Sequence, residues 1–131
     1  MVNSKQKGKR GEQELARYLR EAGFEVTRNW FAQTVEKGHS DIIGIDGWSI
    51  ECKRAANATR IKDWWIQTVD AAAIEQGKTG QLSRPVLIYR LDRAAWRVRI
   101  CICAIDVKLH GQIEMELPTW VRLVDRLDAK S

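Results

Sequence analysis

The stretch GHSDIIGIDGWSIECKR, residues 38–54, decides the fold, because it places two short apolar segments around a turn. The dipeptide Asp46-Gly47 favours the positive φ angles of a tight hairpin turn. The flanking segments HSDIIGID and WSIECKR therefore predict an antiparallel hairpin. Ile50 and Cys52 share one face of the second strand, since residues two apart in a strand point the same way, and both are candidates for the core.

The same hairpin carries charges that a core strand would not carry. Glu51 and Lys53 project side by side from the other face, and Asp41 can approach Glu51 across the sheet. Two carboxylates held that close repel unless a cation lies between them, and Mg²⁺ is bound by one or two carboxylates with waters and phosphate oxygens. A neighbouring lysine can orient or deprotonate a metal-bound water. The hairpin therefore predicts one wall of a site for metal-assisted phosphodiester hydrolysis.

A helix is predicted before this hairpin and another after it. Apolar residues recur at helical spacing over residues 9–22, and Gly23 ends the pattern. Glu12 lies on or near the face of this helix that turns toward the sheet, where metal binding would explain a carboxylate. The second helix is expected over residues 60–75 with Thr59 as its cap.

Strands account for most of the remaining chain. Residues 24–31 have β-branched and aromatic content, residues 85–91 form a near-continuous apolar run, and residues 95–105 alternate between apolar side chains and arginine or cysteine. QIEMEL and a short terminal helix follow. The order of elements predicts a central mixed β-sheet flanked by α-helices, which is an α/β fold.

Two adjacent tryptophans, Trp64 and Trp65, differ by 100° around the second helix. They cannot easily face one core, so we expect one of them to face a partner. The three cysteines cannot all pair with one another and lie in strand-like runs, so we expect free thiols.

With 131 residues the chain has the length of a single domain, expected to span residues 1–131. We expect residues 1–8 to form a basic, flexible N-terminal arm and residues 106–131 to form a C-terminal extension. No apolar run reaches the roughly 20 residues of a membrane span, and no apolar segment follows the N-terminal charges. A cytoplasmic location is expected, in the host cytoplasm if the source is viral.

The net charge is +5 and the sequence pI is about 9.3, which suits a polyanionic partner because neutralising phosphates releases counterions. Basic residues surround the acidic cluster along the sequence, and Ser40 could bond a phosphate near the bond to be cut. Such contacts position DNA without reading its sequence. The candidates are Lys5, Lys7, Lys9, Arg10, Arg28, Lys37, Ser40, Arg54, Arg60 and Lys62.

Three segments together resemble one known family. KGKRGEQELARYLREAGFEVTR, SDIIGIDGWSIECK and RPVLIYRLDRAAWRVRI are similar to the archaeal-type Holliday junction resolvases of the PD-(D/E)XK nuclease superfamily. The resemblance spans roughly residues 7–102. It implies a restriction-endonuclease-like sheet and a nuclease that cuts four-way DNA junctions with paired symmetric nicks.

Residue by residue, the resemblance places Glu12, Asp41, Glu51 and Lys53 on the family's catalytic positions. It implies Mg²⁺, with Mn²⁺ as a substitute, held by Asp41, Glu51, the backbone carbonyl of Cys52 and Glu12. A four-way junction offers two equivalent strands to one small chain, so a homodimer with two-fold symmetry is expected on branched double-stranded DNA.

Two other functions remain open at this point. One is another nuclease of the same superfamily that nicks or cuts flaps or replication forks, since one scaffold serves several substrates. The other is a DNA-binding module of the same fold without catalysis. The presence of all four catalytic-type residues argues against the module.

Overall fold

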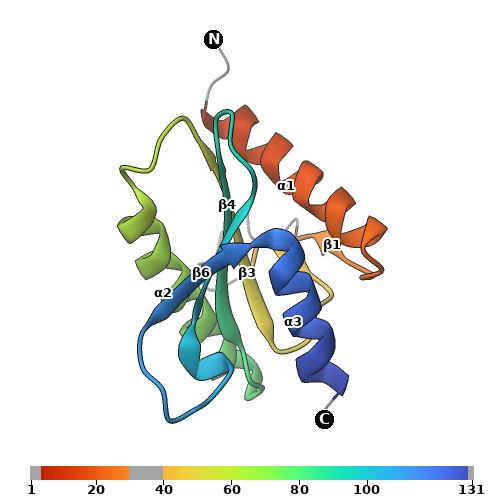
Figure 1. Cartoon of the computed structure of the whole chain (residues 1–131), viewed down its shortest axis with the longest axis vertical. Helices are drawn as coiled ribbons and strands as arrows, with labels where there is room; N and C mark the ends of the chain where they lie inside the picture. Colours follow the sequence, from red (N-terminus) through yellow and green to blue (C-terminus); the bar gives the residue numbers. More distant parts are fainter. Residues whose placement is uncertain (1–3, 30–39, 130–131) are drawn as a thin grey trace.

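The computed structural model describes residues 4–29 and 40–129 of the chain. These residues form one six-stranded sheet with helices on both faces (Figure 1). The elements in chain order are α1 (Ser4–Glu21), β1 (Thr27–Arg28), β2 (Ile42–Ile43), β3 (Trp48–Ala55), α2 (Ile61–Thr79), β4 (Arg84–Leu91), β5 (Arg97–Cys101), the 3₁₀ helix η2 (Ile102–Ala104), β6 (Gln112–Glu116) and α3 (Leu117–Ala129).

The strands lie in the spatial order β1-β2-β3-β4-β5-β6. Only the central pair, β3 and β4, is parallel, and its register pairs Trp48 with Arg84 and Ala55 with Leu91. The other neighbours are antiparallel. The expected mixed sheet flanked by helices is therefore confirmed. Its two longest strands, β3 and β4, finish side by side at the same end of the sheet.

The helices divide between the two faces of the sheet (Figure 1). α1 and α3 cover one face, where Leu15 and Trp120 pack in the main core with sheet residues such as Ile50 and Ile88. α2 covers the other face through a smaller cluster of Trp64, Trp65, Leu87 and Tyr89. Glu51 and Lys53 alternate with the core residues of β3, so they project on the side of α2.

The hairpin predicted from residues 38–54 is confirmed by the pairing of β2 with β3, in which Ile42 lies opposite Ile50. Gly47 has a φ of 84°, which a residue with a side chain rarely adopts. The strand expected over residues 24–31 is paired only at Thr27 and Arg28 within the described part of the chain.

Both long helices are confirmed, with different ends. α1 begins at Ser4, so residues 4–8 of the expected N-terminal arm are helical, while residues 1–3 lie outside the described residues. α2 continues beyond residue 75 and ends at Gly80 in a left-handed conformation. The proposed cap is wrong, because the hydroxyl of Thr59 donates to Asn57 and α2 has Arg60 at its N-cap without a side-chain bond.

The expectation that one tryptophan of α2 faces a partner is also wrong. Trp64 is 5% exposed and Trp65 is 8% exposed. The 100° between them is accommodated because α2 lies broadly across the sheet face, where the rings of Trp64 and Tyr89 have centroids 6.0 Å apart. Both indoles are core residues.

The chain leaves β5 earlier than the alternating pattern predicts. The strand ends at Cys101 and turns into η2, which brings the Cα atoms of Cys101 and Cys103 to 5.2 Å. This separation suits a disulfide, and the structure joins the two sulfurs, so the expectation of free thiols holds only for the buried Cys52. A strand would have kept the two Cα atoms farther apart.

The C-terminal extension completes the sheet and the core. β6 pairs with β5, and α3 places Trp120 and Val124 in the main core with no exposed surface. Helices long and apolar enough to cross a membrane are absent from the described residues.

Candidate active site

The β2–β3 hairpin holds Asp41 beside Glu51. The backbone N–H of Asp41 donates to the carbonyl of Ile50 over 2.7 Å, and the Oδ2 of Asp41 accepts from the backbone N–H of Cys52 over 2.8 Å. These two bonds fix the Asp41 side chain against the strand that carries Glu51 and Lys53. The cross-strand approach predicted from the sequence is therefore present in the structure.

Burial sets the electrostatics of this pair. Burial, followed by the charge of Asp41, raises the pKa of Glu51 to about 9, while the charge of Lys53 opposes that rise. Burial also raises the pKa of Asp41 above its ordinary value, against the lowering effect of the Cys52 N–H bond. Ionising two adjacent, half-buried carboxyls is unfavourable without a cation between them. The pair therefore favours either a retained proton or a bound metal ion.

A third acid reaches this region from α1. Glu12 is 8% exposed, and its carboxylate lies 3.7 Å from the guanidinium of Arg28, which is 7% exposed. The negative charge of Glu12 adds to the factors that raise the pKa of Glu51, so the three acids share one electrostatic environment. Arg28 also lowers the pKa of Asp41 through its charge.

We call Glu12, Asp41 and Glu51 the acid cluster. Arg28 was predicted as a contact for DNA, and its position beside this cluster was missed. β1 pairs Arg28 with Ile42, the residue after Asp41, and this register brings the guanidinium to the site. The alternation of Val26 and Arg28 is a sequence signal that both side chains share a face, and both are buried.

Close contacts tie the first half of α1 to the ends of β3 and β4. A methyl group on Gly11 would lie under 3 Å from Cγ of Arg54, so the helix approaches β3 closely there. One turn away Lys7 pairs with Asp92 over 2.8 Å, and on the other side Glu14 pairs with Arg90. These contacts set the position of the helix that carries Glu12.

The acid cluster fits a hard divalent ion. Asp41 and Glu51 supply carboxylate oxygens, the backbone carbonyl of Cys52 lies between Glu51 and Lys53 in the chain, and Mg²⁺ needs only one or two carboxylates besides waters and phosphate oxygens. A preformed cage of three or more His, Cys, Asp or Glu side chains is absent from residues 4–29 and 40–129.

The other predicted DNA contacts lie in different places. Ser40 is 2% exposed, next to Asp41. Arg54 is half-buried against α1. Lys37 lies outside the described residues, as does the side chain of Lys5. Lys7 is engaged by Asp92. The exposed candidates are Lys9, Arg10, Lys62 and Arg60, and Arg60 lies 3.9 Å from Asp63.

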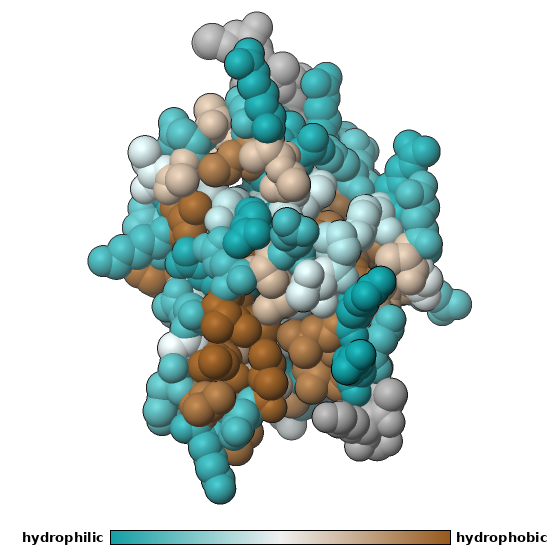
Figure 2. Space-filling view, in the orientation of Figure 1, coloured by the Kyte–Doolittle hydropathy of each residue, from teal (hydrophilic) through white to brown (hydrophobic). Residues whose placement is uncertain are grey.

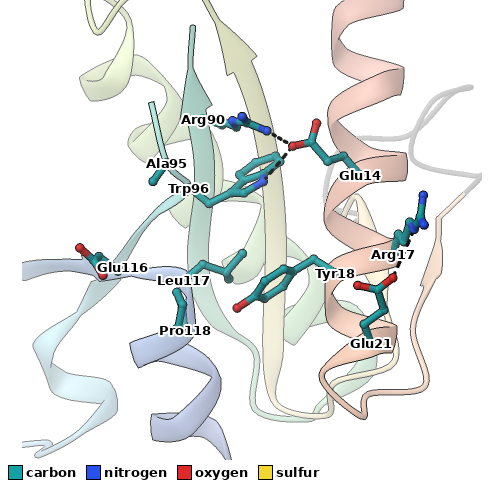
Figure 3. Close-up of a pocket in the computed structure, with 10 residues that line it drawn as sticks. All are labelled: Glu14, Arg17, Tyr18, Glu21, Arg90, Ala95, Trp96, Glu116, Leu117 and Pro118. Carbon is teal, nitrogen blue, oxygen red and sulfur yellow. Dashed lines mark hydrogen bonds and ion pairs between the residues drawn. The ribbon is translucent and has the colours of Figure 1, made fainter. Parts of the chain in front are cut away.

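A cavity of about 530 Å³ lies between α1, the segment that joins β4 to β5, and the start of α3 (Figure 3). Tyr18 and Trp96 line it, and Nε1 of Trp96 donates to Glu14 over 3.2 Å. Asp41 and Glu51 are not among its lining residues. The acid cluster is therefore distinct from this cavity.

The model of a family described as "Phage putative PDDEXK endonuclease" matches residues 3–122. No curated protein matches the chain. Among solved structures, the chain is similar to Hjc, a Holliday junction resolvase from the archaeal hyperthermophile Archaeoglobus fulgidus. The TM-score is 0.49 at 22% sequence identity, over 85% of this chain and 89% of that chain.

Proposed function

The chain belongs to the phage PDDEXK endonuclease family, and from this premise we propose that it is a metal-dependent endodeoxyribonuclease that resolves four-way DNA junctions. The proposed reaction is hydrolysis of a phosphodiester by in-line attack of water. The observation that carries the proposal is the half-buried pair of Asp41 and Glu51, fixed by the hydrogen bond from Cys52 and followed in β3 by Lys53.

Each residue of the candidate active site has a proposed role. Asp41 and Glu51 would hold Mg²⁺, or Mn²⁺ in its place, together with the carbonyl of Cys52, and Glu12 would support the ion from α1. The ion, when bound, would lower the pKa of a coordinated water and neutralise charge on the phosphate. Lys53 would orient the attacking water and accept or share its proton. Burial of the carboxylates supports these roles, because it makes a cation the favourable way to ionise them.

The basic character of the chain supports DNA as the substrate. A net charge of +5 favours a polyanion, and phosphate contacts would place the backbone at the acid cluster. Four-way junctions are proposed as the preferred substrate because the sequence resembles junction resolvases in the segments that carry the acids. A homodimer would present two sites in the symmetry of such a junction.

A substrate panel tests the proposed specificity. Labelled four-way junction, linear duplex and flap DNA of equal length are incubated with the protein with and without Mg²⁺, and products are mapped to the nucleotide. The proposal predicts paired, symmetric nicks in the junction at rates well above those for duplex and flap. Equal cleavage of all three would remove the junction preference and leave the nuclease proposal standing. Light scattering at the concentrations used then measures whether the active species is a dimer.

A further inference from the structure

One end of the molecule gathers basic side chains from elements that are far apart in the sequence. β3 and β4 end together there, with Ala55 opposite Leu91. The start of α1 reaches the same end through the 2.8 Å pair between Lys7 and Asp92, and the start of α2 reaches it through Ile61, which packs with Ala55 and Leu91. Figure 1 shows the β4–β5 connection beside the first turns of α1.

The side chains at this end are mostly cationic. Some cations are engaged by acids, as Lys7 is by Asp92 and Arg90 is by Glu14. Arg60 likewise lies 3.9 Å from Asp63. The remaining cations include Lys9, Arg10, Arg54, Lys62 and Arg93. In Figure 2 hydrophilic side chains extend from this upper end among some apolar ones, whereas the largest gathering of apolar residues lies below the middle of the same face.

The turn after β4 presents Arg93. The N–H of Ala94 donates to the carbonyl of Leu91 over 3.2 Å, which closes a four-residue turn around Asp92 and Arg93. Arg93 has a φ of 63°, the left-handed conformation that is uncommon for a residue with a side chain. The turn is held from three sides, because Nε of Arg90 donates to the carbonyl of Ala94 over 2.9 Å, the N–H of Asp92 donates to Ala55 over 3.0 Å, and the Asp92 carboxylate pairs with Lys7.

Arg93 itself is left available by these contacts. Its side chain is exposed, and the acid next to it, Asp92, is paired with Lys7. The charge of Arg93 is a lesser cause of the lowered pKa of Asp92, after the Lys7 contact. A cation fixed on a rigid turn loses less conformational freedom on binding than one on a mobile chain end, and so contributes more to affinity.

We propose that the turn of residues 91–94 is a contact site for a DNA backbone phosphate, with Arg93 as the main cation and Arg54 beside it. The inference rests on the proposed nuclease function and locates the DNA that flanks the cut bond. Ala55, which pairs with Leu91, lies two residues after Lys53 in β3. At ~3.3 Å per residue, the turn therefore begins about 7 Å from Lys53 along the strand. The turn would therefore hold a backbone phosphate of the DNA that flanks the reacting one.

The contact has a distinct energetic signature. An arginine on a phosphate adds affinity without sequence preference, and each phosphate neutralised contributes about 0.9 to the slope of log affinity against log salt concentration. Loss of Arg93 should weaken binding for all sequences alike and should reduce the salt dependence by about one charge.

Fluorescence anisotropy with a labelled duplex and a labelled four-way junction, in EDTA and at several salt concentrations, tests this inference in the wild-type protein and three variants. Arg93→Gln removes the charge and Arg93→Lys keeps it as a point charge. Arg122→Gln is the matched control, because Arg122 is an exposed arginine on α3. Circular dichroism confirms that each variant is folded.

Arg93→Gln should bind DNA 3- to 10-fold more weakly than wild type, with a salt slope lower by about 0.9. Arg93→Lys and Arg122→Gln should bind with nearly the wild-type affinity. An affinity of Arg93→Gln within two-fold of wild type with an unchanged slope would overturn the inference, as would an equal loss in Arg122→Gln. Either result would leave the nuclease proposal intact if the wild type binds and cuts DNA. Failure of the wild type to bind any DNA would overturn both.

Discussion

The backbone N–H of Cys52 donates a 2.8 Å hydrogen bond to the carboxylate of Asp41 and so joins the two strands of the hairpin at the acid pair. Because Cys52 follows Glu51 directly, the bond that anchors one carboxyl also sets its distance to the other. The half-buried pair that results is unfavourable when both acids are ionised without a cation. The first two predictions follow from this property of the pair.

The first prediction concerns pH. The folded-state pKa of Glu51 is raised from 4.5 to about 9, so the folded protein binds more protons than the unfolded chain between these values. Its contribution to the free energy of unfolding therefore falls as pH rises through that window. Glu51→Gln should remove this fall and raise the Tm of the metal-free protein at pH 8–9 by about 10 °C or more, with little gain at pH 5.

Thermal unfolding in EDTA across that pH range checks the prediction. Glu25→Gln serves as the control, because Glu25 is an exposed acid. A pH-independent difference between Glu51→Gln and wild type would contradict the raised pKa.

The second prediction concerns metal. A divalent ion that binds the folded acid pair should stabilise the protein by RT ln(1 + [L]/Kd), which is about 2.7 kcal/mol at one hundred times the Kd. Added Mg²⁺ or Mn²⁺ should therefore raise the Tm of wild type by several degrees and should leave Asp41→Asn nearly unchanged. Differential scanning calorimetry measures both. Equal stabilisation of the two proteins would place the bound metal elsewhere.

The third prediction uses two glycines of one helix. Replacing a helical glycine with alanine gains up to about 1 kcal/mol of stability from helix propensity. Nothing lies within 4 Å of a methyl group at Gly8, so Gly8→Ala should raise the free energy of unfolding by that amount. Gly11→Ala meets Arg54 and should lower it by about 1–3 kcal/mol, because the helix must move away from β3.

Urea unfolding compares the two variants, and Gly11→Ala combined with Arg54→Ala should recover much of the loss. Cleavage by Gly11→Ala should also fall, because the displaced helix carries Glu12. If Gly8→Ala and Gly11→Ala were equally stable, the close approach of α1 to β3 would be wrong.

The fourth prediction concerns the buried ion pair of Glu12 and Arg28. Removing one partner leaves the other charge buried, which costs about 3–5 kcal/mol. Arg28→Met should therefore be strongly destabilising, and adding Glu12→Gln should restore part of the loss. A double-mutant cycle on unfolding free energies measures this coupling. Additive effects would mean that the two side chains do not interact.

The hairpin was predictable from sequence because its signals are local. Asp46-Gly47 specifies the turn, and the alternation of Ile50 and Cys52 with Glu51 and Lys53 separates the core face from the polar face. The periodicity of α1 likewise marks the helix that carries Glu12, although its first turn lacks the apolar residues that would have revealed the start at Ser4.

Other features depended on contacts that local patterns do not specify. The role of Arg28 follows from the register of β1 on β2. These strands pair over only two residues, so the sequence carries no local pattern that predicts this register. The burial of both Trp64 and Trp65 depends on how α2 lies across Leu87 and Tyr89. The pairing of Cys101 with Cys103 depends on the end of β5 at that point.

The most direct test of the central claim compares metal-dependent cleavage by the wild type and by variants that each change one residue of the site. A labelled four-way junction is incubated with wild type, Asp41→Asn, Glu51→Gln and Lys53→Met, each with and without Mg²⁺, and each protein's binding to the same DNA is measured in parallel. The account predicts cleavage by wild type only with Mg²⁺ and at least a ~100-fold slower reaction in every variant, with DNA binding retained. Cleavage by Asp41→Asn and Glu51→Gln at the wild-type rate, or no cleavage by the folded, DNA-bound wild type, would contradict it.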